Sequence, residues 1–145
     1  MPLQPPPREA DGRVIPHDHQ GINPEDILIR RISEQHLTGE AGNRRISSMA
    51  FQESTDGSGM SIDIAKLIEE SGLDPHNFVT TSEYFCSVQF ATHALRGEGF
   101  QVGYYPVPGN DFHGAVWGIV TRGQKKRIRS LAQWYVEAGG ISLDG

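Results

Sequence analysis

The sequence has one cysteine, no long apolar run and no leader in which basic residues precede apolar ones. A single thiol, Cys86, excludes an internal disulfide and a cysteine-based zinc site, and such usage is typical of a reducing compartment. A membrane-spanning helix needs ~20 consecutive apolar residues, and no segment approaches that length. The N-terminus is rich in proline and acidic, unlike a secretory signal. We therefore expect a cytoplasmic protein that does not associate with membranes.

Strong catalytic and nucleotide-binding signatures are also missing. The chain of 145 residues fits one domain with a single core and leaves little length for a second one. Apolar residues make up 37% of the chain, which is enough for a modest core, while 17 glycines and 9 prolines indicate many loops. We expect one small domain whose function is not announced by a known motif.

Residues 1–24 are predicted to be a proline-rich tail, disordered or draped over a domain that spans residues 25–145. Proline removes backbone hydrogen-bond donors, and the apolar residues between the prolines are sparse. The prolines of this segment are Pro2, Pro5, Pro6, Pro7, Pro16 and Pro24.

Hydrophobic patterns in the rest of the chain predict strands and helices without a strict alternating order. Strands are expected at residues 27–32, 45–51, 100–105 and 112–120, with an extended connector or short strand at 78–81. Helices are expected at residues 65–69, capped by Ser61 or Asp63, and at 82–95 and 124–138. The predicted fold class is therefore α+β: a single small domain with a mixed or antiparallel sheet and about three helices.

Charge is unevenly distributed along the chain. Residues 1–121 carry 8 basic and 16 acidic groups, whereas residues 122–145 carry 5 basic and 2 acidic groups. The five cations open the predicted C-terminal helix, where the helix dipole disfavours positive charge by ~0.3–1 kcal/mol per group. They are Arg122, Lys125, Lys126, Arg127 and Arg129.

Two explanations of this basic cluster remain open. The cations pair with the domain's own carboxylates, or they form a docking surface for a partner. Nucleic acid is disfavoured as the partner because the net charge is -5 and the pI is about 5.6. The prediction is an interaction module that binds a protein partner with an acidic surface.

The six histidines do not have the spacing of a metal site. His17 and His19 lie in the predicted tail, and there is no His-Glu-x-x-His sequence. Neither a metal nor another cofactor is predicted. Cys86, placed at a helix N-terminus, is a candidate nucleophile with His93 or His113 as its base, although a buried inert cysteine is the alternative. This order of residues resembles papain-like peptidases of the cell-wall amidase type.

Four segments resemble a group of small uncharacterised bacterial proteins, over about residues 26–120. The resemblance implies a bacterial origin and a one-domain architecture, and it implies no reaction. The segments are residues 29–32 (IRRI), 45–51 (RISSMAF), 60–63 (MSID) and 106–118 (PVPGNDFHGAVWG).

Polar residues within these strand-like segments suggest a second functional hypothesis. Arg31, Ser47, Ser48, Ser61 and His113 are expected to converge at one end of a sheet and to form an enzyme active site or an anionic-ligand site. His113, Arg31 and Ser47 would be the catalytic residues, and Ser48 and Ser61 would bind the ligand.

An arginine on a first strand and a serine on a second also resemble the ADP-ribosyltransferase layout, which holds a nicotinamide dinucleotide. That layout needs a glutamate on a later strand, and no glutamate of this chain is placed there. The alternative is structural: Arg31 pairs with a carboxylate, the serines bond to backbone groups and His113 forms a hydrogen bond beside a turn.

Overall fold

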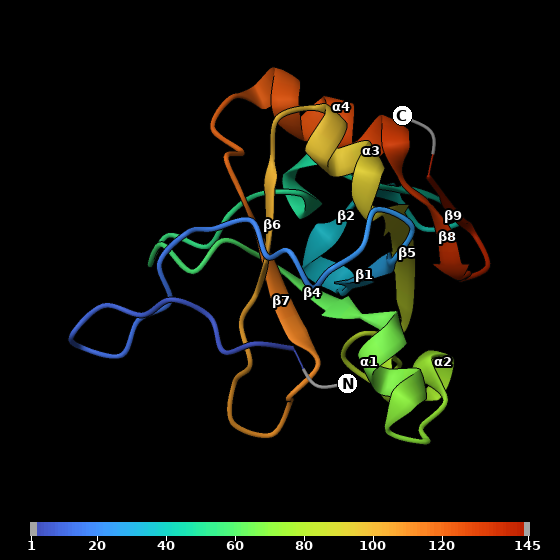
Figure 1. The fold of residues 1–145 in the computed structure, drawn as a ribbon. Coiled ribbons are helices and arrows are strands. Elements are labelled where there is room, and N and C mark those ends of the chain that lie inside the picture. Colours follow the sequence, from blue (N-terminus) through green and yellow to red (C-terminus); the bar gives the residue numbers. More distant parts are fainter. Residues whose placement is uncertain (1–2, 144–145) are drawn as a thin grey trace.

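The computed structural model describes residues 3–143 and contains two β-sheets (Figure 1). The larger sheet has six strands in the order β6-β7-β4-β1-β5-β8, and every neighbouring pair is antiparallel. The smaller sheet has the order β2-β3-β9. The strands are β1 (Ile27–Ile32), β2 (Leu37–Glu40), β3 (Asn43–Ile46), β4 (Met60–Ile64), β5 (Cys86–Ala91), β6 (Gln101–Tyr104), β7 (His113–Trp117), β8 (Gln133–Val136) and β9 (Ile141–Ser142).

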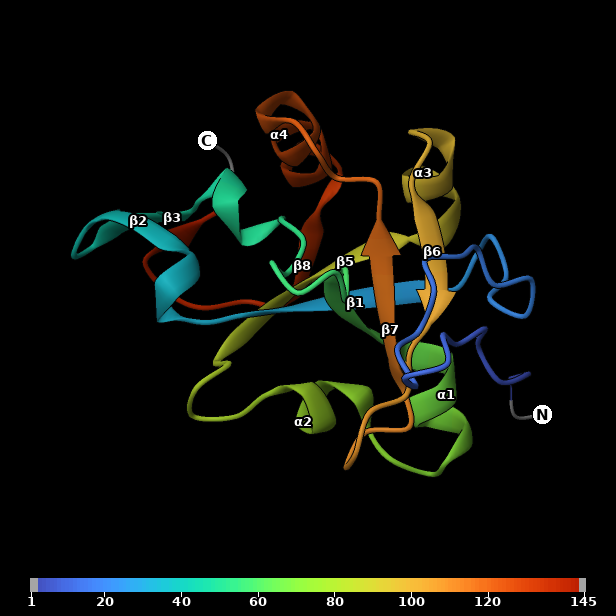
Figure 2. The same cartoon turned by 90° about the vertical axis from the view of Figure 1, so that its left-hand side faces the viewer.

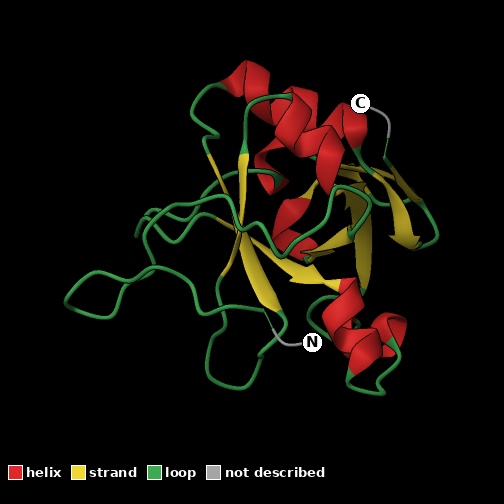
Figure 3. Ribbon diagram, in the orientation of Figure 1, coloured by secondary structure: helices red, strands yellow, loops and turns green. Residues whose placement is uncertain are grey.

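Four α-helices and two 3₁₀ turns connect the strands, which confirms the predicted α+β class (Figure 3). The helices are α1 (Ala65–Glu70), α2 (Pro75–Val79), α3 (Thr92–Gly97) and α4 (Arg122–Leu131), and the 3₁₀ turns are η1 (Glu34–His36) and η2 (Ser48–Ala50). In Figure 2, α3 and α4 lie on one side of the large sheet and α1 and α2 on the other. The sheet is thus the middle layer of the domain.

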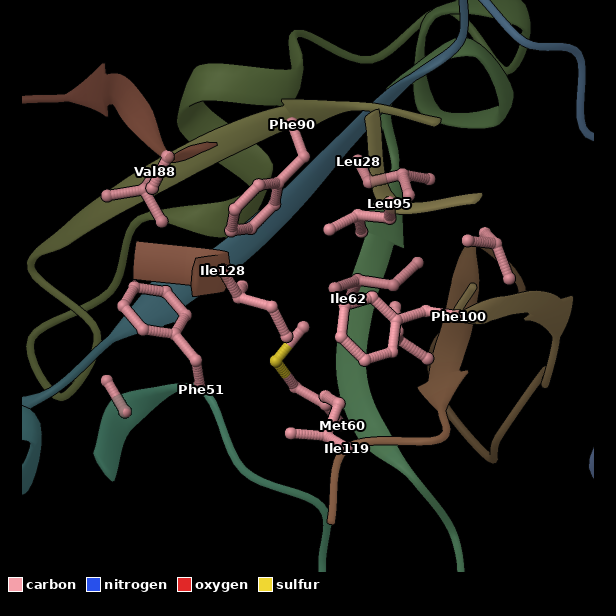
Figure 4. Packing of buried hydrophobic residues seen from close by; sticks show 14 of the residues in the cluster. Leu28, Phe51, Met60, Ile62, Val88, Phe90, Leu95, Phe100, Ile119 and Ile128 are labelled. Atoms are coloured by element: carbon pink, nitrogen blue, oxygen red, sulfur yellow. The ribbon is translucent and has the colours of Figure 1, made fainter. Parts of the chain in front are cut away.

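The main core lies on the face of the large sheet that α3 and α4 cover. Successive strand side chains point to opposite faces, so Met60, Ile62 and Ile64 of β4 enter the core while Ser61 and Asp63 face the other way. Figure 4 shows Met60 and Ile62 packed with Ile128 of α4 and with neighbouring apolar side chains. The polar residues of β4 therefore lie outside the main core.

Residues 3–24 lie along the large sheet, as in the draped alternative for the N-terminal tail, whose first two residues lie outside the described part. Backbone and side-chain hydrogen bonds fix the segment: the His19 amide donates to the Val102 carbonyl at 2.9 Å, and Asp18 accepts from the Val102 amide at 3.1 Å. Val14 and Ile22 are buried. Hydrogen bonds to β6 thus hold this part of the segment against the edge of the large sheet.

The predicted helix at 82–95 is wrong. The chain forms strand β5 and then the short helix α3. Apolar residues at Phe85 and Val88 suit a helical period, but Cys86, Val88 and Phe90 also alternate, and all three are buried. The central position of β5, between β1 and β8, decides in favour of the strand.

Other predicted boundaries also need correction. The chain leaves the small sheet at Ile46 and turns into η2, so residues 47–51 are not a strand. Residues 61–63 belong to β4 and do not cap α1, which begins after Ile64. The predicted connector at 78–81 includes the end of α2, and the predicted helix 124–138 ends at Leu131 and is followed by β8.

Candidate functional site

The large sheet opens between two of its central strands, β1 and β4. Their register pairs only Leu28 with Ile64 and Ile29 with Asp63, after which the two strands separate. The Arg30 side chain fills the opening: Nη1 donates to the Ser61 carbonyl at 3.0 Å, and Nε and Nη2 donate to the Ala50 carbonyl at 3.0 and 2.8 Å. The Arg30 guanidinium thus bonds to a carbonyl of β4 beyond the last backbone pairing between β1 and β4.

A cavity of about 360 Å³ lies at this opening, and we call it the β1–β4 pocket. Its side chains come from both separated strands, from β7 and from four connecting segments. They are Arg30, Arg31, His36, Ser54, Ser61, Asp63, Tyr84, Asn110 and His113.

A buried ion pair forms one wall of the pocket. Arg31 donates from Nε and Nη2 to the two oxygens of Asp63, at 2.8 and 3.2 Å, and the Asp63 side chain is only 4% exposed. Asn110 donates a further hydrogen bond to Asp63 at 2.7 Å. The Arg31 guanidinium also lies 5.4 Å from the ring centroid of Phe78. These contacts fix the plane of the guanidinium, as bidentate pairing and ring contacts do.

The pocket carries a second guanidinium without a carboxylate partner. Burial lowers the pKa of Arg30 to about 10, which leaves it charged at neutral pH. No ion pair joins Arg30 to an acidic group within residues 3–143. The pocket lining therefore contains two guanidinium groups and one carboxylate, that of Asp63, which gives it an excess of positive charge.

His113 presents an unprotonated nitrogen at neutral pH. Its Nδ1 lies 2.7 Å from the Tyr105 carbonyl, which can only accept a hydrogen bond, so Nδ1 carries the proton and Nε2 has the lone pair. Burial lowers the pKa of the ring below its ordinary 6.5, and this effect outweighs the hydrogen bond to Tyr105 and the charge of Asp63, which raise the pKa. The ring is therefore neutral and can accept a hydrogen bond or a proton.

His36 has the opposite tautomer. The Ser33 amide donates to its Nδ1 at 3.0 Å, so the neutral ring carries its proton on Nε2. Burial, followed by the charge of Arg30, lowers the pKa of His36 to about 4. The pocket thus combines one histidine that accepts and one that donates, both neutral near pH 7.

The structure brings three of the five predicted site residues together and separates the other two. Arg31, Ser61 and His113 line the pocket. Ser47 caps η2 by accepting from the Met49 amide at 3.1 Å, and the buried Ser48 lies in the same 3₁₀ turn. Neither serine lines the pocket, because the chain has left the sheet before it reaches them.

Sequence reasoning missed six pocket residues. Asp63 could have been found from the sequence, because it is a polar residue between the apolar Ile62 and Ile64 of a strand-like segment. In the structure Asp63 pairs with His113 of the neighbouring strand β7. Asn110 belongs to the turn before His113. The other missed residues are Arg30, His36, Ser54 and Tyr84, and their convergence depends on the separation of β1 from β4.

Cys86 has none of the features of an activated thiol. It begins strand β5, not a helix, and it is fully buried. Burial raises the pKa of the thiol to about 11, which disfavours the nucleophilic thiolate. His93 is exposed on α3, and neither His93 nor His113 forms a hydrogen bond with Cys86 in the described part of the chain. Cys86 therefore fits the alternative reading, that of a buried and inert cysteine.

The basic cluster of α4 lies on the other side of the sheet from α1 and α2 (Figure 1). Arg127 pairs with Glu98 at 3.0 Å, and Lys125 donates to the neutral side chain of Gln52 at 3.3 Å. Over residues 3–143, Glu98 is the only carboxylate that forms an ion pair with any cation of α4. Internal pairing thus accounts for one of the five cations.

No three histidine, cysteine or acidic side chains of the described residues are grouped so that they would hold a metal ion. The described helices are too short or too polar to cross a bilayer. Comparison with protein-family models, with curated proteins and with solved structures finds no match to this chain.

Proposed function

We propose that the β1–β4 pocket binds a small ligand through an oxyanion, either a phosphate or a carboxylate. The observation that carries this proposal is the excess charge of the pocket: its lining holds two guanidinium groups, Arg30 and Arg31, and one carboxylate, Asp63, which pairs with Arg31. Withdrawing a cation from water without a counter-ion costs several kcal/mol. A bound anion would supply the missing charge.

The two guanidinium groups keep donors for such an anion. A guanidinium has five N–H donors, and Arg30 directs three hydrogen bonds to backbone carbonyls. Arg31 directs two to Asp63, and its Nη1 forms none within the described residues. The side chain of Arg31 is 23% exposed, so an anion can reach it from solvent.

The other pocket residues define the rest of the ligand. Ser54, Ser61, Tyr84 and Asn110 offer hydroxyl and amide groups, and His113 offers the acceptor nitrogen Nε2. A volume of about 360 Å³ is at the low end of ligand sites. A small, hydroxylated phosphate or carboxylate compound fits this chemistry better than an apolar molecule.

The proposal is tested by titrating the protein with inorganic phosphate and, separately, with acetate, while amide chemical shifts are recorded. We expect saturable shifts at Arg30, Arg31, Ser61 and His113. The variant Arg31→Lys keeps the charge but loses the planar fork that Asp63 holds, so affinity should fall roughly tenfold.

The matched control is Arg45→Lys, which alters an exposed arginine of β3 outside the pocket and should leave affinity unchanged. Equal losses in both variants, or shifts that avoid the pocket, would contradict the proposal. Phosphate binding without acetate binding would identify a phosphate ligand, and the reverse would identify a carboxylate.

A further inference from the structure

A second surface of the molecule combines unpaired cations with exposed apolar side chains. Val120, directly before α4, is 80% exposed, and Met49 of η2 is 50% exposed. With Arg122, Lys126 and Arg129 of α4 they form what we call the α4 surface. Of the large apolar residues exposed in the described chain, two of four belong to it.

Hydrogen bonds hold the two segments of the α4 surface side by side. One carboxylate oxygen of Glu53 accepts from the amides of Gly118 and Ile119, each at 2.7 Å. Lys125 reaches Gln52 at 3.3 Å. Met49 and Val120 therefore lie on neighbouring segments, Met49 shortly before the residues that make these contacts and Val120 directly after Ile119.

Hydrogen bonds of a capping box fix the start of α4. Thr121 accepts from the Gln124 amide at 3.1 Å, and the Gln124 side chain accepts in return from the Thr121 amide at 2.8 Å, which is a reciprocal capping box. Ile128 is fully buried beneath the helix. The surface is preorganised, so little of the binding free energy would be spent on ordering it.

We propose that the α4 surface docks an acidic, partly apolar segment of a protein partner. Apolar anchors surrounded by charged side chains are the usual anatomy of such an interface. Carboxylates of the partner would face Arg122, Lys126 and Arg129, which form no ion pair within residues 3–143, and its apolar side chains would cover Val120 and Met49. This proposal is independent of the anion pocket.

Charge favours a short segment over other occupants. Residues 1–121 carry a net charge of -8, which repels the extended phosphates of nucleic acid and an anionic membrane. Interactions beyond a Debye length, ~8 Å at physiological salt, are screened, so a short acidic segment responds mainly to the local cations. A second copy of this chain would bring like charges together if both copies used α4.

The test uses a synthetic peptide in which glutamate and leucine alternate, titrated into the full chain. We expect amide shifts at residues 49–53 and 119–129. The double variant Lys126→Glu with Arg129→Glu should weaken binding by more than tenfold, and Val120→Ser by roughly threefold. The milder pair Lys126→Gln with Arg129→Gln repeats the test with less effect on folding.

The matched control is Lys66→Glu, which reverses an exposed cation on α1, in the opposite layer, and should leave the affinity unchanged. A peptide with glutamine in place of glutamate, or serine in place of leucine, should bind much more weakly. The proposal is overturned if Lys66→Glu has the same effect or if either altered peptide binds equally well. Tighter binding of duplex DNA or phosphatidylserine vesicles, or self-association lost on Lys126→Glu, would also overturn it.

Discussion

The β1–β4 pocket and the α4 surface both contain more cations than carboxylates, but they hold these charges in different ways. In the pocket, Arg31 is clamped by Asp63 and Arg30 by backbone carbonyls, largely away from water. On the α4 surface, Lys126 is exposed, and the three cations form no ion pair within residues 3–143. Buried, oriented charge favours selection of one small ligand, while exposed charge mainly favours encounter with a partner.

The largest effect that separates the two regions is expected from Asp63→Asn. This change keeps the size and shape of the side chain but removes the one carboxylate among the residues that line the pocket. Arg31 then loses its ionic partner while it remains largely enclosed, so the free energy of unfolding should fall by about 3 kcal/mol. Chemical denaturation measures this loss, and Glu83→Gln, at an exposed position, is the control.

A double variant sharpens this result. Replacing Arg31 as well, in Asp63→Asn with Arg31→Gln, removes the unpaired cation and should restore part of the lost stability. If the single variant is as stable as the original chain, the ion pair is not a fixed part of the pocket. The pocket cations would then be no more tightly held than those of the α4 surface.

The second effect is a pH dependence of stability that comes from the pocket histidines and has no counterpart on the α4 surface. The folded-state pKa of His36 is lowered to about 4, against 6.5 for the free side chain. Between these values the unfolded chain binds a proton at His36 that the folded chain does not, so the contribution of His36 to stability is constant above pH ~6.5 and falls as the pH decreases toward 4. Because the His36 ring is only partly buried and solvent screens its charge, the loss from His36 should stay well below the ~3 kcal/mol that the full pKa difference would give.

Denaturation curves across this pH range measure the effect. His113 contributes in the same direction, because its pKa is also lowered. His36→Gln should flatten the curve, whereas His93→Gln, at an exposed position of α3, should not. An unchanged slope in His36→Gln would show that the ring is not enclosed beside Arg30.

Sequence patterns located part of the pocket because they reported polar residues within apolar strands. Arg31, Ser61 and His113 share one face of the sheet and were found in this way. Ser47 and Ser48 also stand between apolar residues, Ile46 and Met49, but the chain turns away after Ile46. Local alternation does not say where a strand leaves its sheet.

Arg30 shows why the other pocket residues could not be predicted from the sequence. Ile29 and Ile32 of the same strand are core residues, and the Arg30 side chain bonds to the Ser61 carbonyl where β1 and β4 separate. That separation is a property of the whole sheet. The C-terminal cations were visible as a cluster, yet their nearness to Met49 depends on contacts of Gln52 and Glu53 with residues 118–125.

The smallest effect is expected at the α4 surface, from Glu53→Ala. The Glu53 carboxylate accepts hydrogen bonds from the Gly118 and Ile119 amides, one of them partly buried. Removing it leaves these amides to water, so the free energy of unfolding should fall by only about 1–2 kcal/mol. Glu53→Gln keeps an acceptor oxygen and is the matched control, with a loss nearer to zero.

The consequence for binding distinguishes this variant from a change in the pocket. Glu53→Ala frees the segment before α4 from the segment after η2, so Val120 and Met49 lose their fixed spacing and the acidic peptide should bind roughly threefold more weakly. Phosphate binding in the β1–β4 pocket should be unaffected, because the adjacent pocket residue Ser54 has its own anchor, a hydrogen bond from its amide to the Gly59 carbonyl at 3.0 Å. Parallel losses for both ligands would mean that the two regions act as one site, and independent losses establish them as two.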